Sequence, residues 1–316
     1  MSRPRTYGSV GGSSVTRFLE PRTLARISNL DLAARTVVEG FISGLHKSPF
    51  FGRSLDFAEH RAYMPGDDIR LIDWRVFARS DRFYVKEFEA DTNTNCTIFL
   101  DVSASMNFGS ESAISGSTSI SKLEYGKYLA ACLAYFSHKQ RDRVGLVTFD
   151  NSIVDFVPPS AKHLEEVLHT IDRIRPGGEG SLRSPLQQAG GFVKRRSIVV
   201  LISDFYEEPD EVLAAASLLR GRGNDVVAFH LLDPVELRFP YQEILDLEDL
   251  ESSARISLHP EAIRAEYQRL IEGHVATLSE KLTEGGIDYH LYDTSVPLDF
   301  ALYTYLSTRQ RTSRLR

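Results

Sequence analysis

From residue 97 onward, short apolar runs alternate with helical segments, and this alternation constrains the fold more than any other feature of the chain. The runs have the length and the branched side chains of strands that are buried on both faces of a sheet. The pattern predicts an α/β fold, a doubly wound, mostly parallel sheet with helices on both faces. The expected strands are residues 98–100, 144–149, 153–157, 197–203, 225–232 and 287–292, of which the second and third are close enough to form a hairpin.

This pattern also indicates how the whole chain is divided into domains and tails. Four parts are expected: a disordered Gly/Ser-rich tail at 1–19, a smaller N-terminal helix/strand region at 20–92, the α/β domain at 93–308 and a frayed basic tail at 309–316. Helices are expected at residues 24–45, 123–140, 161–174, 185–194, 209–222, 260–284 and 297–308, and a half-exposed strand at 81–89. Residues 234–258 are expected to be irregular, with an added strand near 244–247.

The segment from Gly52 to Trp74 is dense in charges, aromatic residues and turn formers. Its Pro65-Gly66 pair predicts a turn. Its arginines lie among several acidic residues, which favours a set of ion pairs that fix an irregular loop. The alternative is an exposed recognition surface that carries the single tryptophan of the chain.

Composition excludes several classes of function. The net charge of −6 gives no reason to expect binding to nucleic acid. No run approaches the ~18 apolar residues of a membrane span, and the first residues lack the apolar centre of a signal peptide. The two cysteines, Cys96 and Cys132, are typical of buried residues rather than of a disulfide framework. We therefore expect a cytoplasmic protein without an integral membrane segment, although its basic ends leave peripheral contact with acidic lipid open.

Small oxygen-bearing side chains follow the first apolar strand. Asp101, Ser103 and Ser105 occur at alternate positions, and the strand at 197–203 is followed by Asp204. With right-handed crossovers these two strands lie side by side, which brings both aspartates to the carboxyl edge of the sheet, where ligands bind. Carboxylate and hydroxyl oxygens suit a small hard cation such as Mg²⁺. The alternative is that the serines only form a turn and cap the next helix.

This layout resembles the von Willebrand factor A domain, whose metal-ion-dependent adhesion site begins with D-x-S-x-S. Such domains usually add a threonine from a Gly-Gly-Thr loop, whereas here Gly180 stands at that position. Ser181, Glu179 or a water would then supply the missing oxygen. The resemblance implies Mg²⁺, or Mn²⁺ or Ca²⁺, bound by Asp101, Ser103, Ser105, Asp204 and Ser181.

A second resemblance covers roughly residues 25–295. The Gly-Asp-Asp of 66–68, the Ile-Asp-Trp of 72–74 and the Ala-Arg of 78–79 precede the D-x-S-x-S strand as in the bacterial domain-of-unknown-function 58 family. The resemblance implies a cytoplasmic von Willebrand-type protein, often encoded beside a MoxR-type AAA+ ATPase. The two proteins would act together in chaperone-like assembly or activation of client proteins.

These observations favour a metal-dependent protein–protein interaction module over an enzyme. One alternative is a scaffolding protein whose metal site has decayed, as Gly180 suggests, and which binds through the arginine-rich segment 61–79 or the basic ends. A less favoured alternative is a Mg²⁺-dependent hydrolase with Asp101 as nucleophile. Such enzymes need a second carboxylate two residues on, and that position is Ser103. The sequence also lacks the Gly-x-Ser-x-Gly and His-Glu-x-x-His motifs.

Overall fold

The structure is a computed structural model that describes residues 29–47, 59–62, 76–77, 79, 82–87, 94–109, 120–250 and 254–314. The chain divides into two compact units, one of residues 39–93 and one formed by the chain before and after them. The predicted tail at 1–19 and the arginine-rich ion pairs expected between Gly52 and Trp74 lie outside the described residues.

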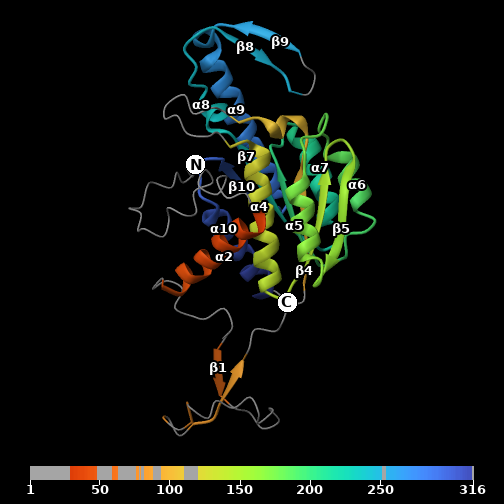
Figure 1. The fold of residues 1–316 in the computed structure, drawn as a ribbon, viewed down its shortest axis with the longest axis vertical. Helices are drawn as coiled ribbons and strands as arrows, with labels where there is room; N and C mark the ends of the chain where they lie inside the picture. Colours follow the sequence, from red (N-terminus) through yellow and green to blue (C-terminus); the bar gives the residue numbers. More distant parts are fainter. Residues whose placement is uncertain are drawn as a thin grey trace. The chain divides into compact units, whose positions relative to one another are not determined.

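The larger unit is built on a six-stranded sheet in the order β10-β7-β6-β3-β4-β5 (Figure 1). Its strands are β3 (Asn95–Asp101), β4 (Arg143–Phe149), β5 (Ile153–Ser160), β6 (Ile198–Ser203), β7 (Asp225–Leu232) and β10 (Asp288–Asp293). β5 runs antiparallel to β4 as the predicted hairpin, and the other pairings of this sheet are parallel. The predicted mostly parallel sheet is therefore confirmed, as is the pairing of β3 with β6 at its centre.

Helices cover both faces of the sheet, as predicted. They are α4 (Lys122–Lys139), α5 (Leu164–Arg173), α6 (Arg183–Ala189), α7 (Pro209–Arg220), α9 (Pro260–Glu284) and α10 (Leu298–Arg314). A further helix, α2 (Leu30–Lys47), precedes them in the chain, and its residues from Glu39 onward belong to the smaller unit. α4 packs on β3, β4, β6 and β7 and contacts α5 and α10. The start of α2 is also buried, and its Arg35 lies 5.8 Å from the ring centroid of Tyr135 on α4. α6, α7 and α9 bury their apolar side chains with Phe99, Val199 and Leu201 of the sheet.

Side chains alternate between the two faces along each strand, and this alternation lets α4 pack against the sheet near its carboxyl edge. Phe99 faces α6 and α7, whereas its neighbour Leu100 faces α4. A Cβ atom at Gly126 would lie 3.0 Å from Leu100 Cδ1, which is tighter than ordinary van der Waals contact, so glycine lets helix and sheet approach without displacing this leucine. The first turn of α4 is thereby held against the ends of the central strands.

The region between β7 and α9 is more regular than the sequence predicted. The strand predicted near 244–247 is confirmed as β8 (Leu245–Glu248), but it pairs with an unpredicted β9 (Arg255–Leu258) and follows an unpredicted helix α8 (Pro234–Arg238). The missed signal is a capping box, in which Asp233 and Glu236 each bind the other's backbone N–H. The last helix is also longer than the predicted 297–308, because α10 continues through Arg314.

The smaller unit contains one antiparallel pair in its described part, between β1 (Glu59–Ala62) and β2 (Tyr84–Glu87). β2 confirms the strand predicted within 81–89. β1 falls in the segment predicted to be irregular, and its short sequence lacks the alternation typical of a strand. Its conformation follows from pairing with β2, which a local pattern does not reveal. In the described part of the chain, no helix combines the length and apolarity needed to cross a bilayer.

Candidate functional site

Asp101 is the last residue of β3 and is only 5% exposed. Its Oδ1 accepts a hydrogen bond from the backbone N–H of Ser103 at 2.9 Å, and its Oδ2 accepts one from the hydroxyl of Ser203 at 2.6 Å. Ser203 lies beside Asp101 because β6 pairs with β3 in a register that joins Leu100 to Ile202. The pairing of the central strands therefore fixes the orientation of this carboxylate.

The two serines of the motif come together as predicted. The Ser103 and Ser105 hydroxyl oxygens are 3.1 Å apart at the start of the short 3₁₀ helix η3 (Ala104–Asn107). Ser103 stands at the N-cap of η3, but its side chain makes no capping hydrogen bond. The following helix α4 is capped by Ser121. The serines do form a turn, since their carbonyls accept the N–H groups of Met106 and Phe108, but the capping role in the alternative is wrong. Their hydroxyls gather beside Asp101.

The loop that precedes α6 contacts the motif through its backbone. Gly177 N–H donates to the carbonyl of Val102 at 2.6 Å, and the Gly178 carbonyl accepts from the N–H of Ala104 at 2.8 Å. The Ser181 N–H donates to the carbonyl of Asp150 on the neighbouring β4–β5 turn. The structure thus places the predicted loop beside the motif, and backbone groups of the two glycines, rather than the side chain of Ser181, make these contacts.

Asp204 is buried at the end of β6, and its position depends on a sharp turn. The next residue, Phe205, adopts a left-handed backbone with φ of 45°, which is strained for a bulky side chain. Its N–H donates to the Ser203 hydroxyl at 3.1 Å, and its carbonyl is 2.8 Å from Nε2 of His274 on α9. These two contacts hold the turn that directs Asp204 to the edge of the sheet.

The cationic partner of Asp204 was not predicted from the sequence. Lys122, the first residue of α4, is completely buried and donates to Asp204 Oδ2 at 2.9 Å and to Glu236 Oε1 at 2.7 Å. Its Nζ also lies 4.6 Å from the ring centroid of Tyr206 and 5.8 Å from that of Phe108. A lysine at the start of a helix faces the positive end of the helix dipole, which is unfavourable without a specific partner. The position of this lysine at the start of a helix is the sequence feature from which a buried carboxylate partner could have been predicted.

Two carboxyl groups of the site, those of Asp101 and Glu236, have raised pKa values. Burial and the charge of Asp204 raise the pKa of Asp101 to about 7, although its hydrogen bonds to Ser203 and Ser103 act in the opposite direction. Burial also raises the pKa of Glu236. Burial by itself would lower the pKa of Lys122. The carboxylates of Asp204 and Glu236 outweigh this effect and raise the pKa of Lys122 above its ordinary value. With three carboxyl groups and one ammonium, the site carries an excess of negative charge that a cation would neutralise.

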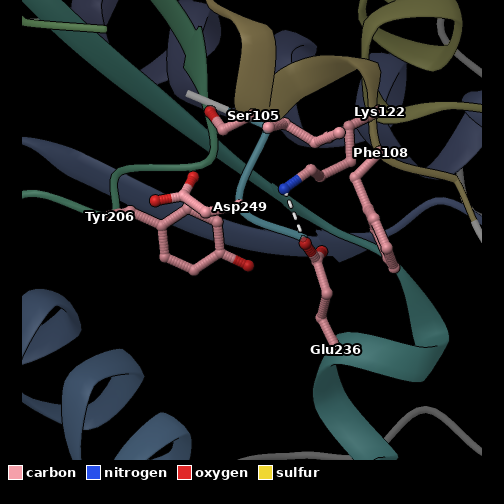
Figure 2. A pocket seen from close by; sticks show the side chains of 7 residues that line it. Ser105, Phe108, Lys122, Tyr206, Glu236 and Asp249 are labelled. Atoms are coloured by element: carbon pink, nitrogen blue, oxygen red, sulfur yellow. Dashed lines mark hydrogen bonds and ion pairs between the residues drawn. The ribbon is translucent and has the colours of Figure 1, made fainter. Parts of the chain in front are cut away.

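A pocket of about 300 Å³ opens beside these groups. Figure 2 shows the Lys122 ammonium pointing toward Glu236, with the rings of Tyr206 and Phe108 on either side. The half-buried Ser105 also lines the pocket, so the D-x-S-x-S motif has a route to solvent. The remaining lining residues are Asp249 and Leu250, which follow β8.

The residues present fit a hard divalent cation. Asp101, Ser103 and Ser105 offer one carboxylate and two hydroxyls at one point, and waters complete the coordination of Mg²⁺ in many sites. Asp204 stands close enough to raise the pKa of Asp101, but its Oδ2 is already bound by Lys122. Within the described residues, no group of three or more His, Cys, Asp or Glu side chains is arranged to hold a metal ion, here or elsewhere, so a cation at this site would depend on the serine hydroxyls and on water.

Behind the site, the buried His230 on β7 should make stability depend on pH. Its Nδ1 lies 2.6 Å from the hydroxyl of Tyr289, and burial, helped by His274 and Lys122, lowers its pKa to about 3. Because the unfolded pKa is about 6.5, the folded protein excludes a proton that the unfolded chain accepts. The associated stability is complete above pH 6.5, and about 2 kcal/mol of it is lost by pH 5.

Urea denaturation at pH 7 and pH 5 measures this dependence. Between pH 7 and pH 5 we expect the free energy of unfolding to fall in both proteins. The fall in the wild type should exceed the fall in His230→Gln by about 2 kcal/mol. His163→Gln, which changes a partly exposed histidine before α5, should keep the wild-type dependence. Equal losses in wild type and His230→Gln would contradict a neutral buried His230.

Comparisons with known proteins bear on this site and its fold. Residues 59–277 match the family model described as "Protein of unknown function DUF58". An uncharacterised protein of Mycobacterium tuberculosis, Rv1480, is 26% identical over 275 residues, which cover 83% of this chain and 82% of that protein. Uncharacterised Mb1516 of Mycobacterium bovis matches to the same extent.

Solved structures also resemble the chain. BatB from Bacteroides thetaiotaomicron has 17% sequence identity and a TM-score of 0.49, over 70% of this chain and 99% of that chain. The vWF domain of the type V pili tip protein Mfa5 from Porphyromonas gingivalis has 10% identity and a TM-score of 0.35, over 71% and 97% of the two chains. Because the family model spans more than half of the sequence, including the D-x-S-x-S motif and its partners, the protein belongs to the DUF58 family.

Proposed function

We propose that this protein is a metal-dependent protein–protein interaction module and not an enzyme. The observation that carries the proposal is the convergence of Asp101, Ser103 and Ser105 at the carboxyl edge of the sheet, beside an open pocket. A Mg²⁺ or Mn²⁺ ion would bind to these oxygens, and Asp204 would contact the ion directly or through a water molecule. The remaining coordination positions of the ion would be open to a partner. A carboxylate of the partner would then complete the coordination, so that affinity depends on the metal.

The same geometry argues against the hydrolase alternative. Both oxygens of Asp101 already accept hydrogen bonds from serines, which lowers the nucleophilicity of this carboxylate. Two residues further on, Ser103 offers a hydroxyl where an acid or base would be needed. Lys122 is completely buried and bound to two carboxylates, so it is a poor acid or base.

The proposed partner is a MoxR-type AAA+ ATPase, with which the module would assemble or activate client proteins. This part of the proposal rests on the family resemblance. A cytoplasmic setting belongs to it as well, and the two thiols Cys96 and Cys132 are both buried and reduced in the fold. The scaffolding alternative keeps one specific observation in its favour, because Lys122 already neutralises Asp204.

A pull-down against the organism's own MoxR-type ATPase tests the proposed function. We expect retention of the ATPase by the full chain in 5–10 mM Mg²⁺, roughly the excess that saturates weak oxygen sites, and loss of retention in EDTA. Asp101→Asn should abolish retention because it removes the charged metal ligand. Asp288→Asn, which changes an acidic residue at the start of β10 and therefore at the opposite edge of the sheet, should bind like wild type. Equal retention with EDTA, or by Asp101→Asn, would favour the scaffolding alternative.

A further inference from the structure

We propose that the ammonium of Lys122 and a divalent cation compete for Asp204, and that metal binding leaves Lys122 on Glu236 alone. The inference deepens the proposed function and rests on the same site. It makes Lys122 an internal competitor that sets how tightly the site binds metal, and it couples the metal site to α8.

Lys122 occupies the charge of Asp204 in the metal-free protein. Its Nζ is 2.9 Å from Asp204 Oδ2, and both side chains are buried, with exposed fractions of 0% and 4%. Water therefore screens this contact only weakly. A cation that binds Asp204 must displace the ammonium from it or share the carboxylate with it.

Glu236 can hold the ammonium without Asp204. Lys122 Nζ is 2.7 Å from Glu236 Oε1, while Glu236 Oε2 accepts the backbone N–H of Asp233 at 2.7 Å. This capping interaction fixes Glu236 independently of the metal site. The Tyr206 ring, 4.6 Å from Nζ, adds a cation–π contact that persists as the ammonium shifts. A short movement of the lysine head therefore leaves it bound to a carboxylate and to an aromatic face (Figure 2).

The shift of the ammonium has a consequence for the pocket. Glu236 and Tyr206 both line it, and Tyr206 hydrogen-bonds to Glu236. Transfer of the full charge of Lys122 to Glu236 would strengthen the contact between α4 and α8 at the wall of the pocket. Metal binding at one side of the pocket is thereby linked to the element that forms the opposite side, where a partner would bind.

A charge-neutral double variant separates competition from general electrostatics. Lys122→Met/Glu236→Gln removes one positive and one negative charge, so the local net charge is unchanged, and glutamine still fits the capping box. Asp204 then loses its competitor. The matched control is Lys281→Met/Asp210→Asn, which removes an ion pair between α9 and α7 that lies nearer the surface.

The experiment is calorimetric titration of Mn²⁺ into the three metal-free full-length proteins. We expect the Kd to fall at least tenfold in Lys122→Met/Glu236→Gln and to stay within about twofold of wild type in the control. Binding by the double variant alone would support competition while contradicting metal-dependent function in the wild type. Equal affinity in wild type and double variant would overturn the inference and leave the proposed function standing. Absence of binding in all three would overturn the inference too, since removal of the competitor should open the site.

A structure of the Mn²⁺-loaded wild type provides a second readout that does not depend on folding of the variant. We expect the contact from Lys122 Nζ to Asp204 to be lost, while the contact to Glu236 is kept. Retention of the 2.9 Å contact to Asp204 with metal bound to the same carboxylate would overturn the inference.

Discussion

Replacement of Asp101 by asparagine should abolish metal binding and raise stability in the absence of metal. Asparagine keeps the shape of the side chain but removes its charge, and we expect the affinity for Mn²⁺ to fall by roughly 100-fold or more. Even loss of an outer hydrogen-bond partner of a ligand costs about 10–100-fold. Thermal unfolding with and without Mn²⁺ measures the effect. At 100 times its Kd, the metal should stabilise wild type by about 2.7 kcal/mol and leave the variant unchanged.

The gain in stability follows from the direction of the pKa shift. Burial and Asp204 raise the pKa of Asp101 to about 7, so the folded protein binds its proton more tightly than the unfolded chain does. The stability linked to that proton is complete below the unfolded pKa of 3.8 and is lost as pH rises to about 7. An uncharged amide in place of the acid avoids this loss, so Asp101→Asn should be more stable than metal-free wild type at pH 8. A Mn²⁺-dependent increase in melting temperature in the variant would contradict the assigned role of Asp101.

Replacement of Lys122 by methionine should cost about 3–5 kcal/mol of stability, the usual penalty when one partner of a buried ion pair is removed. Methionine fills most of the space of the lysine stem but leaves Asp204 and Glu236 buried without a counter-charge. Urea denaturation in the absence of metal measures the loss.

Two variants control this prediction. Lys127→Met changes a lysine on the same helix whose ammonium binds the carbonyls of Asp172 and Ile174, and it should cost about 1 kcal/mol or less. Adding Glu236→Gln to Lys122→Met should restore part of the lost stability, because one of the two uncompensated carboxylates is then neutral. A loss in Lys122→Met no larger than in Lys127→Met would show that the buried ammonium is not needed to neutralise the site.

Much of the fold could be predicted because strands and helices of an α/β sheet carry strong local patterns. The apolar runs predicted five of the strands of the central sheet, and β5 followed from its nearness to β4. The convergence of Asp101 with the end of β6 followed from the handedness of crossovers, a rule that holds for nearly all parallel pairs. Asp101, Ser103, Ser105 and Asp204 could therefore be placed at one edge of the sheet before any contact was known, whereas the predicted Ser181 donates its backbone N–H to Asp150.

Other features depend on contacts that no local pattern encodes. The position of Lys122 at a helix start hints that it has a specific partner but does not name one, because its ammonium reaches residues 82 and 114 positions away. Ser203 ends a strand like many serines, and its bond to Asp101 arises only from the register of β3 and β6. The short β1, and β9 as the partner of the predicted β8, have weak propensities and form through pairing.

Anomalous diffraction from Mn²⁺-loaded crystals of the wild type tests the central claim most directly. We expect a manganese peak at the carboxyl edge of the sheet, bonded to Asp101, Ser103 and Ser105, at a Mn²⁺ concentration above the measured Kd. A peak bound elsewhere, or an empty carboxyl edge under these conditions, would contradict the claim that these residues form a metal site.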